Sequence, residues 1–291
     1  MSQVTPHPAE ALRAALAQGL VMAPGAPDAL TARMIAQAGF PALYMTGLGA
    51  NAARLGLPDL GLMSGSEMVA QARDLTRAVT IPVIADADTG YGGVLNIRRT
   101  VQDYAQAGVA ALHLEDQQSP KRCGQLAGIR LVPAEEAALR LRAALAARGA
   151  EKLLVIGRTD ALPAMGMAEA LDRARRYQDA GVDLVFIDGV KRLAELEEIA
   201  RALPGPKVVS IVDGTETVAL RAGELQQMGF SLALYAVSTL FTAIRAIGET
   251  LAALHREGST ASRAPAMASY AEFAAVVGLA EQQGWAEEFG G

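Results

Sequence analysis

The sequence has a single cysteine among 291 residues, which excludes a disulfide framework and a four-cysteine zinc site. Aromatic residues make up only 4% of the chain, so stacking platforms for bases or sugars are not expected. The formal net charge of −5 is opposite in sign to that of a typical nucleic-acid-binding protein. These shortages point away from disulfide-rich folds and predict no nucleic-acid partner.

The chain also has little that suggests a secretory route or a membrane. Residues 1–10 contain no basic region followed by an apolar run, so no secretory signal is predicted. The most apolar long stretch, 231–254, is interrupted by Arg245 and Glu249 and fits a strand followed by a helix better than a membrane span. We therefore expect a cytoplasmic protein without a membrane partner.

A repeated pattern of helix, glycine and strand runs through a globular composition of 51% apolar and 20% charged residues. Four times, a helical segment ends at a glycine that a short apolar strand follows: Gly39, Gly108, Gly181 and Gly229. Glycine suits this position because it adopts the left-handed conformation without a Cβ clash. Four copies in one chain indicate βα units and a parallel sheet.

Eight strands and eight helices fit the chain between residues 20 and 255. The expected strands are 20–23, 42–46, 82–86, 111–116, 153–158, 184–188, 207–212 and 232–235. The expected helices are 29–38, 65–78, 95–107, 133–148, 167–180, 193–202, 217–228 and 238–255. This count predicts an α/β protein with a closed (β/α)8 TIM barrel in residues 1–258. No Gly-x-Gly-x-x-Gly segment follows the first strand, which weakens the open, dinucleotide-binding alternative.

The last segment, 259–291, is predicted to form a C-terminal helical arm. A helix is expected over 270–284, and Trp285 and Phe289 follow it. This is more apolar surface than a free tail should expose, so we expect the arm to pack on the barrel or on a neighbouring subunit. A homo-oligomer is the expected assembly.

Acidic residues gather where two neighbouring strands end, and the active site of a parallel barrel lies at those ends. Asp86 and Asp88 share a face of one strand end, and Glu115 belongs to the same layer of the next strand. Three neighbouring carboxylates repel one another unless a positive group neutralises them, and Mg²⁺ suits such a thin set of oxygen ligands. The alternative is that these acids cap helices and pair with arginines. His113 shares a face with Glu115 and belongs either to the site or to the barrel filling.

Cys123 lies in the long connection after the fourth strand, beside Lys121 and Arg122. The two cations favour its thiolate and make it a candidate acid or base, unless it is an incidental surface cysteine. The prolines and glycines around it would let this connection close over a substrate as a lid. Arg158 ends the fifth strand and can either bind a carboxylate in a bidentate fork or pair with the nearby acids.

Together these segments resemble the isocitrate lyase/phosphoenolpyruvate mutase superfamily over residues 20–254. The resemblance is carried by MTG at 45–47, LGLPDLG at 55–61, DADTGYG at 86–92, HLEDQ at 113–117, PKRCG at 120–124 and RTDA at 158–161. It implies a (β/α)8 barrel whose last helix is swapped between subunits, in a tetramer or a dimer. It also implies a Mg²⁺ ion, with Mn²⁺ as an alternative, and a small carboxylic or oxo-acid substrate.

The resemblance further implies roles for the matched residues. Asp86 would hold the metal directly, with Asp88 and Glu115 acting mostly through water, and Asp59 would lie near the reacting atoms. The substrate carboxylate would be lined by Tyr44, Thr46, Gly47 and Leu48. Lys121 and Cys123 match the signature that separates the carbon–carbon lyases from mutases and decarboxylases that lack the cysteine.

The sequence departs from the family pattern among the residues that would face the substrate. Gln125 stands where the lyases have a histidine, and Ile129 where a basic residue is expected. Asp188 is shorter than the usual glutamate, Ser210 replaces an asparagine, and Ala236 replaces a proline. Gln125 cannot carry charge or shuttle a proton. Because the shorter side chains enlarge the pocket, the identity of the substrate stays open.

The implied reaction is cleavage of a carbon–carbon bond in a methylisocitrate- or dimethylmalate-like 2-hydroxy di- or tricarboxylate, giving an oxo-acid and a second carboxylic acid. Tyr44 or Asp59 would remove the hydroxyl proton, and Arg158 would hold the developing charge or a product carboxylate. Cys123, polarised by Lys121, would protonate the carbanion. Three alternatives stay open: a phosphonomutase acting on a phosphonopyruvate-like acid, an oxaloacetate decarboxylase or hydrolase, and a non-catalytic oxo-acid-binding protein.

Overall fold

A computed structural model of the chain describes residues 7–149 and 152–291. Eight parallel strands form one sheet in the order β1-β8-β7-β6-β5-β4-β3-β2. The strands are β1 (Val21–Pro24), β2 (Leu43–Met45), β3 (Val83–Asp86), β4 (Ala111–Glu115), β5 (Leu154–Thr159), β6 (Leu184–Ile187), β7 (Lys207–Ser210) and β8 (Leu232–Tyr235). The eight expected strands are therefore confirmed, each within a few residues.

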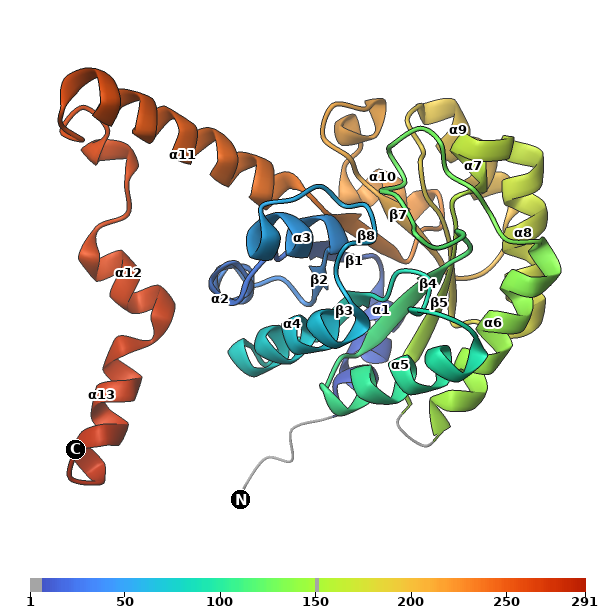
Figure 1. Cartoon of the computed structure of the whole chain (residues 1–291), viewed down its shortest axis with the longest axis horizontal. Helices are drawn as coiled ribbons and strands as arrows, with labels where there is room; N and C mark the ends of the chain where they lie inside the picture. Colours follow the sequence, from blue (N-terminus) through green and yellow to red (C-terminus); the bar gives the residue numbers. More distant parts are fainter. Residues whose placement is uncertain (1–6, 150–151) are drawn as a thin grey trace.

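The sheet curls into a nearly closed barrel, as Figure 1 shows. Its two end strands meet at one isolated parallel bridge between Gly25 and Tyr44. Just beyond this bridge, the amide of Ala26 donates a hydrogen bond of 2.8 Å to the Tyr44 carbonyl. The expected TIM-like α/β barrel is thus confirmed, with a seam between β1 and β2.

Helices alternate with the strands and surround the barrel (Figure 1). Around the barrel they are α1 (Pro8–Gln18), α2 (Ala29–Gln37), α3 (Gly47–Leu55), α4 (Gly65–Ala78), α5 (Val94–Gln106), α6 (Ala134–Ala147), α7 (Ala161–Met165), α8 (Met167–Ala180), α9 (Leu193–Ala202) and α10 (Ala222–Gln227). The C-terminal helices are α11 (Ser238–Glu257), α12 (Tyr270–Val277) and α13 (Leu279–Glu288), and two 3₁₀ helices are η2 (Glu216–Ala219) and η3 (Ala264–Ala266). Among the described residues, none of these helices is long and apolar enough to cross a membrane.

The repeated glycines act as the sequence predicts. Gly39, Gly108, Gly181 and Gly229 follow the ends of α2, α5, α8 and α10 with φ values of 85°, 85°, 92° and 81°. Residues with a Cβ seldom adopt this left-handed conformation. Each glycine therefore ends its helix and turns the chain back toward the next strand.

The predicted helix over 217–228 is wrong as a single element. The structure has η2 and α10 instead, because Leu220 and Arg221 take extended backbone conformations between them. The expected helix over 270–284 is likewise divided into α12 and α13 at Gly278, whose φ is 70°. Helices α1, α3 and α7 were not expected, because each is additional to the eight strand–helix units that the sequence predicts.

Two apolar layers hold the barrel together. The larger layer lies between the strands and the surrounding helices, and the smaller one fills the barrel interior. Interior residues on the strands include Val21, Ile84, Leu154, Ile156, Leu184, Phe186, Val208 and Leu232. Ala9 and Leu12 of α1 join them, so α1 covers the amino-terminal end of the strands. The opposite end, where the strands finish, is left for polar residues.

Helices α11, α12 and α13 extend away from the barrel (Figure 1). The outer face of α11 exposes Phe241, Ile244, Ile247 and Leu251, with exposed fractions of 45–59%. Helix α12 touches the barrel through Gln37 of α2, whose side-chain amide donates to the carbonyls of Ala275 and Val276. The division of the chain at residue 258 and the packing of 259–291 on a second subunit stay predictions.

Candidate active site

A cavity of about 280 Å³ opens at the carboxyl ends of the strands. The predicted site residues that line it are Tyr44, Thr46, Leu48, Asp59, Asp86, Cys123, Gln125, Arg158, Asp188 and Ser210. Other predicted residues, Gly47, Asp88, Glu115 and Lys121, contact members of this set directly, as described below. The barrel therefore brings together residues that are up to 166 positions apart in the sequence.

Asp86 is the last residue of β3, and its carboxylate is held by surrounding donors. Its Oδ2 accepts from the Gly47 amide at 3.2 Å and the Tyr44 hydroxyl at 3.4 Å, and its Oδ1 accepts from the Asp88 amide at 3.0 Å. A Cβ at Gly47 would lie 2.5 Å from Oδ2, so this approach requires glycine. Burial acts to raise the pKa of Asp86, but His113 and the nearby cations outweigh it and leave the pKa well below its usual value. Asp86 is therefore ionised.

The first turn of α3 supports this negative charge. Thr46 caps the helix by accepting from the Gly49 amide at 3.3 Å, and Gly47, which follows it, donates to Asp86. The backbone amides at a helix start carry partial positive charge, which favours carboxylates nearby. Thr46 and Leu48 also line the cavity, so the same turn faces any ligand there.

Lys121 lies among the acidic residues as a buried cation. Its Nζ is 2.7 Å from the Asp59 carboxylate and 2.8 Å from Asp88 Oδ1. Although burial acts to lower the pKa of Lys121, Asp88 and Glu115 raise it well above its usual value. Burial raises the pKa of Asp88 to about 6, against the opposing effect of Lys121. The ion pair between Lys121 and Asp59 thus links the connection after β4 to the loop that carries Asp59.

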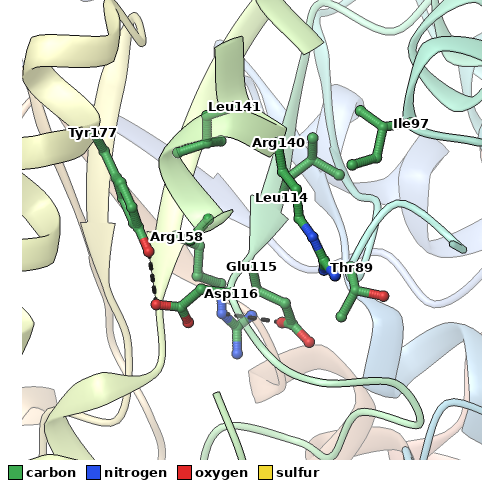
Figure 2. Close-up of a pocket in the computed structure, with 10 residues that line it drawn as sticks. Thr89, Ile97, Leu114, Glu115, Asp116, Arg140, Leu141, Arg158 and Tyr177 are labelled. Carbon is green, nitrogen blue, oxygen red and sulfur yellow. Dashed lines mark hydrogen bonds and ion pairs between the residues drawn. The ribbon is translucent and has the colours of Figure 1, made fainter. Parts of the chain in front are cut away.

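Glu115 and Arg158 lie side by side at the ends of β4 and β5, as Figure 2 shows. Glu115 Oε2 is 3.3 Å from Arg158 Nε, and neither Glu115 oxygen accepts a hydrogen bond from the described residues. Burial raises the pKa of Glu115 well above its usual value. The carboxyl group is therefore buried with oxygen atoms left over for another ligand.

Arg158 is shared among several acids. Its Nη2 is 2.6 Å from Asp188 Oδ2 and 3.0 Å from Asp160 Oδ1, and its Nε donates to the same Asp160 oxygen at 3.1 Å. The guanidinium also lies 5.4 Å from the centre of the Phe186 ring, within the range of a cation–π contact. The expected pairing of Arg158 with nearby acids is confirmed, and its binding of a substrate carboxylate stays a prediction, although the side chain lines the cavity.

The Asp116 carboxylate is bound by neighbouring side chains and does not line the cavity, although Asp116 directly follows Glu115. Figure 2 shows its carboxylate turned to Tyr177, whose hydroxyl donates at 2.7 Å. The Thr159 hydroxyl donates to the same oxygen at 2.6 Å, and Arg173 Nη1 at 3.1 Å. Side chains of successive strand residues point to opposite faces, which separates Asp116 from the cavity.

His113 and Tyr44 form a buried pair inside the mouth of the barrel. The Tyr44 hydroxyl lies 2.8 Å from His113 Nε2, and His113 is fully buried. Burial lowers the pKa of His113 to about 4, so the ring is neutral at pH 7. Burial and Asp86 raise the pKa of Tyr44 well above its usual value. A phenol with a raised pKa favours donation of a hydrogen bond, and the choice between Tyr44 and Asp59 as the base stays a prediction.

The expectation that neighbouring cations favour the Cys123 thiolate is wrong. Lys121 turns to Asp59 and Asp88, and Arg122 Nη1 donates to the Ala127 carbonyl. Burial instead raises the pKa of Cys123 to about 11. Cys123 lines the cavity as a protonated thiol, which suits an acid rather than a base.

The connection after β4, residues 116–133, is anchored over the cavity. Gln117 accepts from the Arg122 amide at 2.9 Å and donates to Asp160 Oδ2 at 2.8 Å. A Cβ at Gly124 would lie 2.7 Å from Arg158 Nη2, so glycine lets this backbone approach the guanidinium. The predicted closing of this connection as a lid stays a prediction, but its backbone already lies against the site.

The donor set at the end of β3 and β4 fits a hard divalent cation only in part. Asp86 is ionised at the cavity, and Glu115 offers two buried oxygens without hydrogen bonds from the described residues. Asp88, in contrast, faces the Lys121 ammonium. No three His, Cys, Asp or Glu side chains form a metal-binding group within residues 7–149 and 152–291. Oxygen donors of this kind suit Mg²⁺ with most of its water retained.

Several residues that line the cavity were given no role in the sequence analysis. They belong to the far wall, which is formed by residues at or after the ends of β7 and β8: Val212, Asp213, Leu234, Val237 and Phe241. Their position after apolar strands was a usable signal, although their mostly apolar character gave no chemical clue. The expected departures Ser210 and Ala236 lie on the same wall.

Comparisons with known proteins match this geometry to a family. The family model described as phosphoenolpyruvate phosphomutase matches residues 12–255. The chain is 40% identical over 260 residues to 2,3-dimethylmalate lyase of Eubacterium barkeri, covering 89% of this chain and 90% of that protein. It is 39% identical over 266 residues to the chloroplastic carboxyvinyl-carboxyphosphonate phosphorylmutase of Arabidopsis thaliana, covering 90% and 78%.

A solved structure shows the same likeness in three dimensions. Oxaloacetate acetylhydrolase in complex with the inhibitor 3,3-difluorooxalacetate is similar with a TM-score of 0.92 and 34% identity, covering 98% of each chain. The names of these relatives state three different reactions, so the family and not the reaction is common to them. The chain belongs to the phosphoenolpyruvate phosphomutase family, within the isocitrate lyase/phosphoenolpyruvate mutase superfamily.

Proposed function

We propose that the protein is an enzyme that cleaves a carbon–carbon bond in a 2-hydroxy di- or tricarboxylate, using Mg²⁺ or Mn²⁺. The observation that carries this proposal is that Cys123, as a protonated thiol, lines the same cavity as Arg158 and Asp86. Cleavage leaves a carbanion that must receive a proton, and an acidic thiol can deliver it. The 40% identity to 2,3-dimethylmalate lyase supports the same class of reaction.

The acids at the ends of β3 and β4 would hold the metal ion, Asp86 directly and Asp88 and Glu115 mostly through water. When bound, the ion supplies a Lewis acid that lowers the pKa of the substrate hydroxyl and stabilises the carbonyl of the oxo-acid product. The amide of Gly47 helps to keep Asp86 ionised, as its hydrogen bond of 3.2 Å indicates.

The remaining steps belong to side chains of the cavity. Arg158 binds a substrate carboxylate, and Asp59, oriented by Lys121 and Asn51, takes the hydroxyl proton. The carbon–carbon bond breaks with its electron pair on the carbon of the departing acid. Cys123 Sγ then gives its proton to that carbon, which completes the second carboxylic acid. The 116–133 connection would exclude water from this basic carbon.

A second candidate function is hydrolysis of an oxaloacetate-like acid. The TM-score of 0.92 with oxaloacetate acetylhydrolase favours it. Water would add to the oxo group in that reaction, and the carbon–carbon bond would then break to leave an acetate carbanion that also takes up a proton. The products therefore separate the two functions: oxalate and acetate for the hydrolase, pyruvate or glyoxylate for the lyase.

The test is an incubation of the purified protein with 2-hydroxy di- and tricarboxylates, oxaloacetate and phosphonopyruvate, with MgCl₂ or with EDTA. Proton and phosphorus NMR identify the products. Metal-dependent release of pyruvate or glyoxylate, lost in Cys123→Ser, supports the lyase. Oxalate and acetate from oxaloacetate would assign the hydrolase, and rearranged phosphonopyruvate the mutase. No product from any acid would overturn an enzymatic function in favour of an oxo-acid-binding protein.

We also propose that the protein assembles with copies of itself, as a tetramer or a dimer with the last helices exchanged between subunits. The exposed apolar face of α11, with Ile244, Ile247 and Leu251, supports this assembly. Exposed apolar patches of this kind mark association surfaces in soluble proteins.

A further inference from the structure

The charges around the cavity are strongly unequal. Among the described residues that line it, Arg158 is the only basic one. Four aspartates line the same space: Asp59, Asp86, Asp188 and Asp213. A ligand with several negative charges therefore meets mostly negative side chains.

Arg158 has room for one further carboxylate. Its Nη2 contacts Asp188 and Asp160, and its Nε contacts Asp160 and lies 3.3 Å from Glu115. None of these contacts uses the third nitrogen, Nη1, and the Arg158 side chain lines the cavity. Three acids already share this guanidinium, so it cannot neutralise two more anions at once.

The cations Lys121 and Arg122 lie close to Cys123 in the chain but do not line the cavity. The Lys121 ammonium is buried between Asp59 and Asp88 at 2.7 and 2.8 Å. The side chain of Arg122 is exposed and donates to the Ala127 carbonyl. Gln125, which lines the cavity beside Cys123, is neutral.

The far wall of the cavity is mostly apolar, with Ser210 and Thr215 as neutral polar residues and one acid at its rim. Val212, Leu234, Val237 and Phe241 form this wall. Asp213 lies at its exposed edge and accepts a hydrogen bond of 2.7 Å from the Ser238 hydroxyl. The wall thus offers contacts to alkyl groups and repels carboxylates.

We propose that the cavity selects a dicarboxylate with small alkyl substituents and discriminates against tricarboxylates. One carboxylate would bind at the metal end beside Asp86 and the second at Arg158. A third would lie against the apolar wall and Asp213 without a cation. The proposal rests on the proposed function and narrows its substrate class.

The expected discrimination follows from the cost of leaving a charged group without partners. An unpaired third carboxylate weakens binding by about 10-fold to 100-fold. A methyl group placed against Val212 or Phe241 strengthens binding by about 4-fold, because it leaves water.

The test uses two ligands that differ by one carboxylate. 2-Methylisocitrate is 2,3-dimethylmalate with a carboxylate added to the methyl group on carbon 3. Isothermal titration calorimetry in saturating MgCl₂ gives the Kd of each acid for the Cys123→Ser variant, in which the proposed cleavage is slowed so that binding reaches equilibrium. We expect 2,3-dimethylmalate to bind at least about 10-fold more tightly, and malate more weakly than 2,3-dimethylmalate. Equal or tighter binding of 2-methylisocitrate would overturn the proposal.

A charge reversal at the rim makes the test specific to the cavity wall. Asp213→Lys should improve the ratio of tricarboxylate to dicarboxylate affinity by roughly 5-fold or more. Asp179→Lys is the matched control, because Asp179 is exposed near the end of α8, outside this cavity. A ratio that changes equally in both variants contradicts the proposal. Since the readout is binding, absent turnover would refute the lyase reaction and leave this result intact.

Discussion

Lys121 offers a direct test of how the site is held together. Its ammonium lies 2.7 Å from Asp59 and 2.8 Å from Asp88, and all three side chains are at most 5% exposed. At an effective dielectric constant of ~20, each contact represents roughly 6 kcal/mol of attraction before the cost of desolvation is subtracted. The variant Lys121→Met would leave two buried carboxylates without their cation.

We expect Lys121→Met to lower the free energy of unfolding by about 3–5 kcal/mol, the usual cost of breaking a buried ion pair on one side. For a chain of 291 residues the Tm should then fall by at least ~5 °C. Urea unfolding followed by circular dichroism measures the first quantity, and thermal unfolding the second. The matched control is Lys191→Met at an exposed position, which should stay within about 0.5 kcal/mol of the wild type.

A second substitution identifies the cause of the loss. Adding Asp88→Asn to Lys121→Met removes one of the two stranded charges and should restore about 1–3 kcal/mol. The reasoning is refuted if Lys121→Met unfolds like Lys191→Met. It is also refuted if the added Asp88→Asn restores nothing, because the loss would then come from packing and not from charge.

The other predictions concern the thiol, the buried histidine and the outer helix. Cys123→Ser should lower turnover by ~10²–10⁴-fold in steady-state assays while the dicarboxylate still binds; near-normal turnover would remove the thiol from the reaction. Because the pKa of His113 in the folded protein lies near 4, below its usual value of 6.5, its contribution to stability is full above pH 6.5 and disappears as the pH falls toward 4. His113→Gln should therefore flatten the loss of unfolding free energy between pH 6.5 and 4, by up to about 3 kcal/mol; parallel curves would contradict the assignment. Ile247→Glu, on the exposed face of α11, should reduce the mass measured by light scattering, whereas an unchanged mass would place the subunit contact elsewhere.

The repeating part of the fold could be predicted from sequence because local chemistry dictates it. A glycine such as Gly108 ends a helix wherever the left-handed conformation is required, and the apolar strand that follows has few other places to be buried. The break at Leu220 and Arg221 could not be predicted in this way. Those residues are extended although the segment has a helical composition, because tertiary packing overrides a weak local preference.

The sequence predicted where the site residues lie better than it predicted which of their side chains are charged and with which groups they pair. Strand ends placed Asp86, Arg158 and Asp188 around one cavity, as parallel topology requires. Lys121 pairs with Asp59 and Asp88, which come from other parts of the chain. Its closeness to Cys123 in the sequence therefore suggested an interaction with the thiol that the structure does not have. The pKa of the Cys123 thiol is raised by burial, and the burial of a side chain cannot be deduced from its neighbours in the sequence.

The backbone pairing around the barrel is uneven, because the seam between β1 and β2 differs from the other junctions. Seven neighbouring pairs of strands are joined by ladders, whereas this junction has the Gly25–Tyr44 bridge. Tyr44 therefore takes part in the junction that has a bridge in place of a ladder, and its hydroxyl also donates a hydrogen bond to Asp86. Widening the mouth at this junction would break fewer backbone hydrogen bonds than widening it at a laddered pair, so a bulkier ligand would meet the least backbone resistance there.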